Sequence, residues 1–593
     1  MNVLEFYEKR IVLYSGELER IERKIRSISL QRLGVLLLVG ISLYFGFNGN
    51  PMAFTIAAGL FILFLYFIKQ HSIAFVEKIR VAELVLLNKN EVAFQKGDKS
   101  VFDAGLDFNI SNHLYALDLD IFGKGSLFQA INRSATLSGK LLLGDALLKP
   151  LSNELDINRR REAIHDLAPD IEWRQGFYVS GVQSQERPTD RKQLTAWLAL
   201  PEFFDRRAFW IFFTVFTSII SMAIILYCIV TAQFLVQLIF APLLINSLVF
   251  IFISSDVKKY FEYFGNKTKQ FKKYGNLFEH ISKRNFSSPE SAELQERCSE
   301  ASGAFRKLFE LSGLAESRAN QMVGPIMNGY FLFDLWIIYR IEKWRRANKN
   351  FFDQWIDSLV AIDMISSLSN FSFNHPDFVD AEVKATKPFI SAMSLAHPLM
   401  STAISVKNHY EVGLTSRLHV ITGSNMAGKS TFIRAVGMNL VLACNGVPVC
   451  AKEFSCSVMG LITSIRITDS LEENASYFKA ELNRLEQLVN YLKTEQPFIV
   501  LLDEILRGTN SDDKRLGTQS FLLKLKQYNC IVLLATHDLS IGKLELEYPG
   551  IVENYCFESQ FAGDGLIFDY KLRKGISSST NATFLMKRMG LID

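Results

Sequence analysis

Paired cysteines, metal-ligand clusters and a large net charge are all missing from this chain of 593 residues. The seven cysteines lie scattered without a C-x-x-C pair, which argues against a disulfide framework or a zinc site and indicates a reducing compartment. The nine histidines show no metal-ligand spacing either. A formal net charge of only +4 creates no field that favours nucleic acid as a partner of the whole molecule. The length leaves room for several domains and a large core, and no internal repeat divides it.

Charge is also absent from four long apolar runs, which decide the class of the protein: Leu33–Phe47, Met52–Ile68, Ala208–Val230 and Phe234–Ile253. The first two runs are near the lower limit of about 17 residues for a helix that crosses a bilayer, and the last two are longer. The runs therefore predict two transmembrane hairpins, with turns at residues 48–51 and 231–233. A secretory signal is the alternative for the first run, but the mixed-charge segment Asn2–Gln31 before it argues against cleavage. A buried helical pair is the alternative for the first hairpin.

The distribution of basic residues predicts how these hairpins are oriented. The turns carry no Lys or Arg, whereas the bases carry Arg32, Lys69, Arg206, Arg207, Lys258 and Lys259. By the positive-inside tendency the bases face the cytoplasm. An even number of spans places the N-terminus and the C-terminal part on the same side, where ATP is available. We therefore expect an integral membrane protein with lipid as one partner.

The remaining segments are soluble in character. Asn2–Gln31 has the pattern of an amphipathic helix, residues 101–201 form an α-rich block, and residues 256–370 are again helical. Two basic clusters, Lys267–Lys273 and Arg340–Arg346, could follow a phosphate backbone, lie against anionic lipid, or form the solvated face of a long helix. From Ala396 onward apolar strands alternate with helices, which is an α/β pattern.

The most specific motif is a glycine-bounded loop with the spacing G-x-x-x-x-G-K-S between an apolar strand and a helix. Its residues are Val420, Ile421, Thr422, Gly423, Ser424, Asn425, Met426, Ala427, Gly428, Lys429, Ser430 and Thr431. The two glycines let successive backbone N–H groups point at phosphate oxygens, and the following helix adds the positive end of its dipole. Lys429 would reach the β- and γ-phosphates, and the Ser430 hydroxyl would bind Mg²⁺. A chance glycine loop is the alternative.

Two further strands end in residues suited to nucleotide hydrolysis. The apolar run from Pro497 ends in Asp503 and Glu504, as a buried parallel strand would at the ligand-binding edge of a sheet. Asp503 would hold Mg²⁺, and Glu504 would orient and deprotonate the attacking water. A second run, Cys530–Ala535, leads to His537, which could stabilise the γ-phosphate or serve as a structural histidine.

This set of motifs resembles the MutS family of mismatch-repair ATPases, which are ABC-type ATPases. The loop matches the family pattern T-G-P-N-M-G-G-K-S-T, and the similarity continues in Asp503–Asn510, in Ala535–His537, in the pair His397-Pro398 and in Gly446–Ala451. Ala475–Glu481 is similar to the family signature S-T-F-x-x-E. The resemblance implies a homodimer in which Ser476 completes the ATP site of the other subunit, although an ordinary helix N-cap is the alternative for Ser476.

The chain also departs from the family pattern. Ser424, Ala427 and Leu506 stand where the family has Pro, Gly and Gly, and 471–474 lacks the usual glycines. Family membership implies DNA binding and mismatch repair, yet the second hairpin occupies the place of the DNA-gripping clamp. Membrane runs begin where a mismatch-reading domain of about 100 residues would be expected. Phe6-Tyr7-Glu8 matches the family's F-x-E but has no such domain to present it.

Together these patterns predict α-helical transmembrane hairpins, an α-helical core with lever helices, and an α/β P-loop (ABC-type) ATPase domain. The expected division is 1–99 for the amphipathic helix and first hairpin, 100–205 for the first half of a MutS-like core, 206–255 for the second hairpin, 256–395 for returning lever helices and 396–593 for the ATPase domain. A transporter-like ABC ATPase is the alternative, but an L-S-G-G-Q signature and intramembrane charges are missing. A nucleotide-binding membrane tether is a third possibility, against which the intact set of Asp503, Glu504 and His537 argues.

Overall fold

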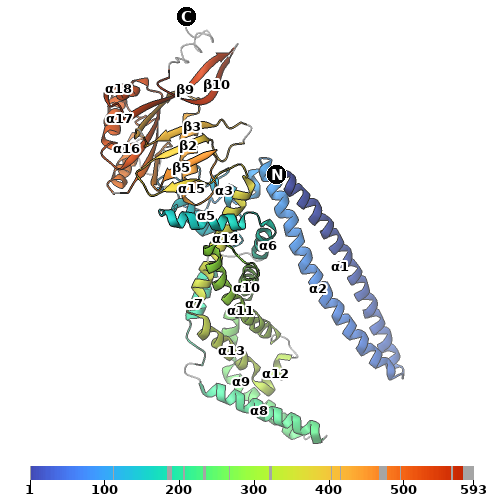
Figure 1. Ribbon diagram of the computed structural model, residues 1–593. Coiled ribbons are helices and arrows are strands. Elements are labelled where there is room, and N and C mark those ends of the chain that lie inside the picture. The colour runs from blue at the N-terminus through green and yellow to red at the C-terminus, as the bar shows by residue number, and fades with distance from the viewer. Residues whose placement is uncertain are drawn as a thin grey trace.

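The computed structural model describes residues 2–110, 112–182, 190–204, 208–231, 236–265, 267–318, 323–401, 404–414, 416–466, 477–494, 496–562 and 565–577. Three parts are visible in Figure 1: an α/β head, a column of helices that descends from it, and two long helical hairpins. Most of the described chain is helical, and the strands all lie in the C-terminal part, as the sequence predicts.

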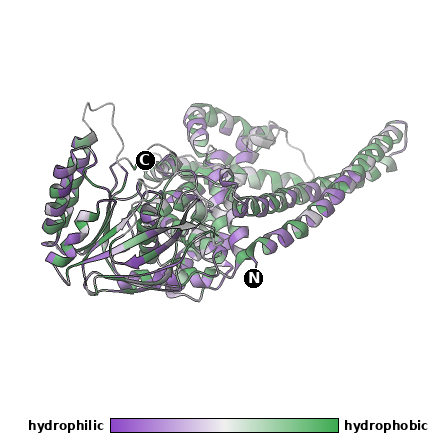
Figure 2. Ribbon diagram, turned by 90° about the horizontal axis from the view of Figure 1, so that it is seen from above, coloured by the Kyte–Doolittle hydropathy of each residue, from purple (hydrophilic) through white to green (hydrophobic). Residues whose placement is uncertain are grey.

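The first hairpin consists of two very long antiparallel helices, α1 (Val3–Phe47) and α2 (Met52–Gln95). Buried residues of α1 recur every seven positions and form the seam with α2: Tyr7, Tyr14, Ile21, Ile28 and Val35. The amphipathic helix and the first apolar run expected from the sequence are thus one continuous helix. No proline interrupts residues 3–47, and the chain turns only at Asn48–Pro51, where Gly49 has a φ of 100°. The far half of the hairpin is predominantly hydrophobic (Figure 2).

The column is built around one central helix, α14 (Phe352–Asn374), which is buried along most of its length. It contacts α3 (Leu127–Ile131), α4 (Leu137–Leu148), α5 (Glu154–Leu167), α6 (Ile171–Val182) and α11 (Pro289–Ser317). The carboxylate of Asp363 on α14 accepts hydrogen bonds from the backbone N–H groups of Ala135 and Thr136, at 2.8 and 2.9 Å. The start of α4 is thereby held against α14. The 3₁₀ helix η1 (Lys99–Val101), α7 (Asp190–Ala199) and α10 (Thr268–Ser282) complete this part.

The second hairpin, α8 (Ala208–Thr231) and α9 (Val236–Gly265), projects from the lower end of the column (Figure 1). Two further helices pack beside it, α12 (Val323–Phe331) and α13 (Phe333–Asn348). Among the described residues, four helices are long and apolar enough to cross a membrane: α1, α2 and the segments Phe209–Thr231 and Phe240–Gly265 of α8 and α9. The basic positions Arg206 and Arg207 and part of the turn expected at 231–233 lie outside the described residues.

The head contains two sheets. The smaller has the order β1-β5-β2-β3, from Glu382–Lys384, Glu453–Ser457, Ile390–Leu395 and Asn408–Val412. The larger has the order β10-β9-β4-β8-β7-β6, from Gly565–Lys574, Val552–Ala562, Leu418–Gly423, Cys530–Thr536, Phe498–Asp503 and Gly460–Ser464. All neighbours in the larger sheet are parallel except β9 and β10. The strands begin at Glu382, before the α/β segment expected from Ala396.

Helices cover both faces of the larger sheet, which explains why its central strands are continuous apolar runs. Alternate residues of β7 point to opposite cores: Ile499 and Leu501 join the core that includes α15 (Lys429–Cys444), whereas Val500 and Leu502 join the core that includes α16 (Tyr477–Leu492) and α17 (Ser511–Leu525). The short η2 (Leu539–Lys543) and α18 (Leu544–Glu547) follow β8. This layering brings the ends of β4, β8 and β7 to one edge.

Candidate functional site

The glycine-bounded loop connects β4 to α15 and needs its two glycines. Gly428 has a φ of 100° and Gly423 a φ of 152°. A Cβ atom on Gly423 would lie 2.7 Å from the carbonyl oxygen of Phe557, so only glycine fits there. The Nζ of Lys429 folds back and donates hydrogen bonds to the carbonyl oxygens of Gly423 and Ser424, at 2.7 and 2.9 Å. Burial lowers the pKa of Lys429 from its ordinary value, while the charges of Glu504 and Asp503 oppose that shift.

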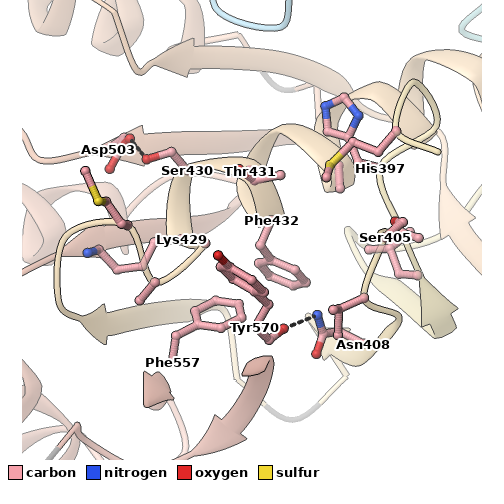
Figure 3. A pocket seen from close by; sticks show the side chains of 18 of the residues that line it. His397, Ser405, Asn408, Lys429, Ser430, Thr431, Phe432, Asp503, Phe557 and Tyr570 are labelled. Atoms are coloured by element: carbon pink, nitrogen blue, oxygen red, sulfur yellow. Dashed lines mark hydrogen bonds between the residues drawn. The ribbon is translucent and has the colours of Figure 1, made fainter. Parts of the chain in front are cut away.

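The loop meets the end of β7 through a hydroxyl and a carboxylate. Ser430 Oγ donates a hydrogen bond of 2.5 Å to Asp503 Oδ2 (Figure 3). Burial raises the pKa of Asp503 above its ordinary value, and the hydrogen bond from Ser430 works in the opposite direction. A hydroxyl and a carboxylate oxygen side by side form the type of donor set that Mg²⁺ prefers, so the residues present fit this ion.

Glu504 and His537 face each other across the ends of β7 and β8. His537 Nδ1 lies 3.1 Å from Glu504 Oε1. Burial pushes the pKa of Glu504 upward, but the hydrogen bond and charge of His537, together with Arg507 and Lys429, bring it below the ordinary value. Glu504 is therefore an ionised carboxylate at neutral pH. Its backbone has a φ of 51°, a conformation that costs about 1–3 kcal/mol and is typical of functional positions.

Two residues that the sequence analysis gave no role hold the turn after Glu504. Arg507 donates from Nε to the carbonyl oxygen of Glu504 at 2.9 Å and from Nη2 to that of Asp503 at 3.0 Å. The buried carboxylate of Glu481, on α16, accepts the backbone N–H groups of Leu506 and Arg507 at 2.5 and 3.0 Å. Glu481 is the last residue of the signature-like segment, so that pattern was the available signal. Residues 467–476, including the predicted Ser476, lie outside the described residues.

A cavity of about 740 Å³ opens beside the loop, with Lys429, Ser430, Asp503 and Glu504 in its wall. Another part of the wall is aromatic and consists of Phe432, Phe557 and Tyr570, which lie close together next to the loop (Figure 3). His397 and Asn408 line the cavity beyond these rings. Tyr570 sits at a bulge of β10, and a Cβ atom on Gly428 would lie 3.0 Å from its ring. The sequence analysis missed Tyr570, because no local sequence pattern predicts that β10 folds back over the loop.

The remaining predicted loop residues occupy different environments. Asn425 and Met426 line the cavity, Ala427 is buried, and Thr431 lies on α15 beside Ser430. The Ser424 hydroxyl is buried, and no hydrogen-bond partner for it occurs in the described part of the chain. Positive φ values occur at Met426 and Gly428 but not at Ala427, so the departure from glycine at 427 carries no backbone strain. Leu506 does have a φ of 60°, and there a glycine would be unstrained.

Comparison with known proteins gives a consistent result for this part of the chain. Residues 419–587 match the sequence model of MutS domain V. DNA mismatch repair protein MutS of Thermotoga petrophila is 30% identical over 246 residues, which cover 40% of this chain and 30% of that protein. The protein of the same name from Persephonella marina is 31% identical over 239 residues, covering 39% and 26%.

A human relative, MutS protein homolog 4, is 28% identical over 241 residues, which cover 38% of this chain and 24% of that protein. The matches thus span less than a third of the length of these relatives. The match to MutS domain V, at residues 419–587, includes the glycine-bounded loop and the strands that lead to Asp503, Glu504 and His537. From this C-terminal similarity, the chain belongs to the MutS family.

Proposed function

We propose that this chain is a membrane-anchored ATPase that binds ATP with Mg²⁺ at the loop of residues 423–431 and hydrolyses it as a homodimer. The observation that carries the proposal is convergence at one sheet edge. Lys429 and Ser430 follow β4, Asp503 and Glu504 end β7, and His537 follows β8. Phosphate-binding, metal-binding and water-activating groups thus share one cavity, as phosphoryl transfer requires.

Each side chain has one task in this proposal. Lys429 exchanges the carbonyl oxygens of Gly423 and Ser424 for the β- and γ-phosphates. Ser430 and Asp503 hold Mg²⁺, which neutralises negative charge on the phosphates when bound. Glu504 orients a water molecule and accepts its proton, and His537 keeps the Glu504 carboxylate in position beside the γ-phosphate. By family resemblance, Ser476 of one subunit completes the ATP site of the other.

Replacing Ser430 should weaken the metal site selectively. We expect Ser430→Ala to raise the Mg²⁺ concentration needed for half-maximal turnover about tenfold, because it removes one metal ligand and the hydrogen bond that holds Asp503. A magnesium titration of ATPase activity checks this result. Ser520→Ala, an equally small change on the exposed face of α17, should leave the titration curve unchanged.

Tyr570 should bind the base of ATP by stacking. We expect Tyr570→Ala to raise the dissociation constant for ATP about tenfold, because the loss of a base–aromatic stack costs about 1–3 kcal/mol. Tyr570→Phe keeps the ring and should bind ATP normally. Fluorescence titration with a labelled ATP analogue measures both variants. Equal affinity of Tyr570→Ala and the unsubstituted protein would contradict this role.

Membrane anchoring rests on the two hairpins. Large apolar side chains of α1, α2, α8 and α9 are exposed, among them Leu37, Phe47, Ile62, Ile219 and Phe252. So many exposed large apolar side chains on the same helices mark contact with lipid or with a partner. Resistance of the protein to extraction from membranes by alkaline carbonate would support the anchoring, and release by carbonate would contradict it.

The names of the relatives raise DNA mismatch repair as a second function, and one experiment separates it from a membrane function. ATP turnover of the purified, detergent-solubilised protein is measured alone, with matched duplex DNA and with duplex DNA containing a mismatch. Stimulation of turnover by the mismatched duplex would favour a function in DNA repair. That stimulation should decline steeply as the salt concentration rises, because contacts with phosphates depend on salt. Turnover that ignores DNA would favour a motor directed at the membrane. No turnover under any condition would overturn the proposed ATPase.

A further inference from the structure

The helix α13 has two faces of different character. On its inner face Glu342 accepts the backbone N–H of Phe203 and of Phe204, and Arg345 donates to the carbonyl oxygens of Leu198 and Leu200. These hydrogen bonds hold residues 198–204, which precede α8 in the chain, against α13. The outer face carries Trp336, Arg340 and Lys343, which are exposed and follow the spacing of one helical face.

The contacts show that α13 runs antiparallel to α8. They also place the first half of α13 beside the start of the apolar run of α8. Going back along α13, Arg345 lies at Leu198–Leu200, and Glu342 lies at Phe203–Phe204. Trp336 and Tyr339 then share a cavity of about 140 Å³ with Ile211 and Thr214 of α8. Just before α13 begins, Ser218 Oγ of α8 donates a hydrogen bond of 3.1 Å to the carbonyl oxygen of Phe331. Ser218 lies about 15 Å along α8 from Ala208, at about 1.5 Å per residue.

At the corner between α12 and α13, side chains replace the hydrogen bonds that the break in the helix removes. Leu332 has a φ of 45°, and its side chain is fully buried. The Phe331 carbonyl is bound by Ser218, and the Asn328 side chain accepts the backbone N–H of Asp334 at 2.9 Å. Side chains thus supply hydrogen bonds where the helix is broken, which is the condition for irregular backbone at membrane depth.

The helix α12 has the composition and contacts of a membrane-inserted segment. Val323–Phe331 contains no charged residue. Its Gly329 packs closely on α9, since a Cβ atom there would lie 3.2 Å from Leu243 Cγ, inside the apolar run. One turn before Gly329, the side chain of Ile326 is 57% exposed. An exposed isoleucine at this depth along α9 faces lipid if the hairpin spans the bilayer.

Two basic side chains of α13, Arg340 and Lys343, are exposed at the end of this element. Within the described residues, Arg340 and Lys343 form no ion pair, whereas Arg345 lies 3.8 Å from Glu342 and Arg346 lies 3.4 Å from Glu202. In the other basic cluster of the sequence, Lys267 and Lys273 are buried, whereas Lys269 and Lys272 are exposed. The unpaired charges lie one to two turns beyond Trp336, a residue type that anchors helices at the membrane interface.

We infer that α12 and the first half of α13 form a re-entrant element in the cytoplasmic leaflet, and that Arg340 and Lys343 bind the headgroup of an anionic phospholipid. The acyl chains of this phospholipid would lie along Trp336 and the cavity that α13 shares with α8. Charge complementarity favours this lipid, since the cytoplasmic surface of membranes is negative and attracts Lys and Arg near it. The inference rests on the proposed membrane anchoring and adds the class of lipid and the residues that select it.

Quenching of tryptophan fluorescence by brominated lipids tests the inference on the full-length protein in vesicles. The signal of Trp336 is isolated by subtracting the Trp336→Phe variant. We expect brominated phosphatidylglycerol to quench Trp336 more strongly than brominated phosphatidylcholine. The preference should fall about fivefold for each charge removed and about 25-fold in the double variant R340Q/K343Q. Added salt should also lower it.

A matched control removes two exposed charges from the head. K387Q/K543Q changes the net charge equally and should leave the lipid preference unchanged. Equal quenching of Trp336 by both lipids would overturn selection of an anionic headgroup. If the protein resists carbonate extraction but Trp336 is not quenched by either lipid, the insertion of α13 is overturned while the membrane anchoring stands. Release of the protein by carbonate would overturn the anchoring itself, so the failures of the two proposals are distinguishable.

Discussion

Glu504→Gln should lower ATP turnover about 10²–10⁴-fold, the range attributed to general acid–base catalysis. The amide keeps the size of the carboxylate but cannot accept a proton from water. Binding of ATP should persist, because Lys429, Ser430 and Asp503 remain in place. The variant should therefore accumulate as an ATP-bound dimer. Steady-state turnover and size-exclusion chromatography in the presence of ATP measure the two effects.

A matched control and the opposite outcome make this prediction specific. Glu486→Gln removes the same charge from the exposed face of α16 and should hydrolyse ATP normally. Unchanged turnover in Glu504→Gln would show that another group activates water. Loss of ATP binding in Glu504→Gln would show instead that the carboxylate is needed to hold the phosphate-binding loop in place.

Arg133→Met should lower the free energy of unfolding by about 3–5 kcal/mol, the cost of breaking a buried ion pair by removing one partner. Arg133 Nε lies 2.6 Å from Glu91 Oε1, and both side chains are at most 5% exposed. The methionine fills much of the space but leaves the Glu91 carboxylate without its ion-pair partner. Asn370 and Asn374 still donate to Glu91, at 3.0 and 3.3 Å, but supply no charge.

This ion pair matters because it joins the first hairpin to the column. Glu91 lies on α2, and its partners Asn370 and Asn374 lie on α14, the central helix. Tyr7 of α1 donates a hydrogen bond of 2.7 Å to Asn374 Oδ1, so both helices of the hairpin reach α14. Arg174 of α6 donates to Asn370 Oδ1 at 2.6 Å. One buried polar network therefore connects the hairpin base to the helix that leads into the head.

Urea unfolding of the detergent-solubilised protein, followed by circular dichroism, measures the loss. Lys96→Met is the matched control on the same hairpin, since it breaks the ion pair between Lys96 and Glu8, at 2.9 Å. Both partners are exposed there, and such pairs contribute about 0–1 kcal/mol. If both variants lost a similar free energy of unfolding, the larger contribution expected of the buried ion pair between Glu91 and Arg133 would be contradicted.

Features that depend on neighbouring residues in the sequence were predictable. The strand, loop and helix around Gly423 and Lys429 appear as β4 and α15, and the run ending at Asp503 appears as β7. Parallel strands share an edge, so the meeting of Ser430 with Asp503 followed from their positions after two such strands. The apolar runs likewise became helices of spanning length, because twenty or so consecutive apolar residues have few other stable arrangements in water or lipid.

Features that depend on contacts between distant segments were not predictable. Tyr570 reaches Gly428 only because β10 turns back over the loop, and Glu481 reaches the turn at Leu506 only because α16 packs beneath β7. The break between α12 and α13 depends on a hydrogen bond from Ser218, more than a hundred residues away. No local preference of residues 323–339 encodes that partner.

By itself the sequence determined the family, the phosphate-binding pattern and the presence of four apolar helices, since each is written in residues close together in the chain. Only the tertiary structure decided that His537 contacts Glu504, how Glu91 ties the first hairpin to α14, and which basic residues of α13 form no ion pair within the described part of the chain. The physical reason is that burial and charge pairing are properties of a three-dimensional neighbourhood. Such neighbourhoods bring together residues that sequence separation keeps far apart.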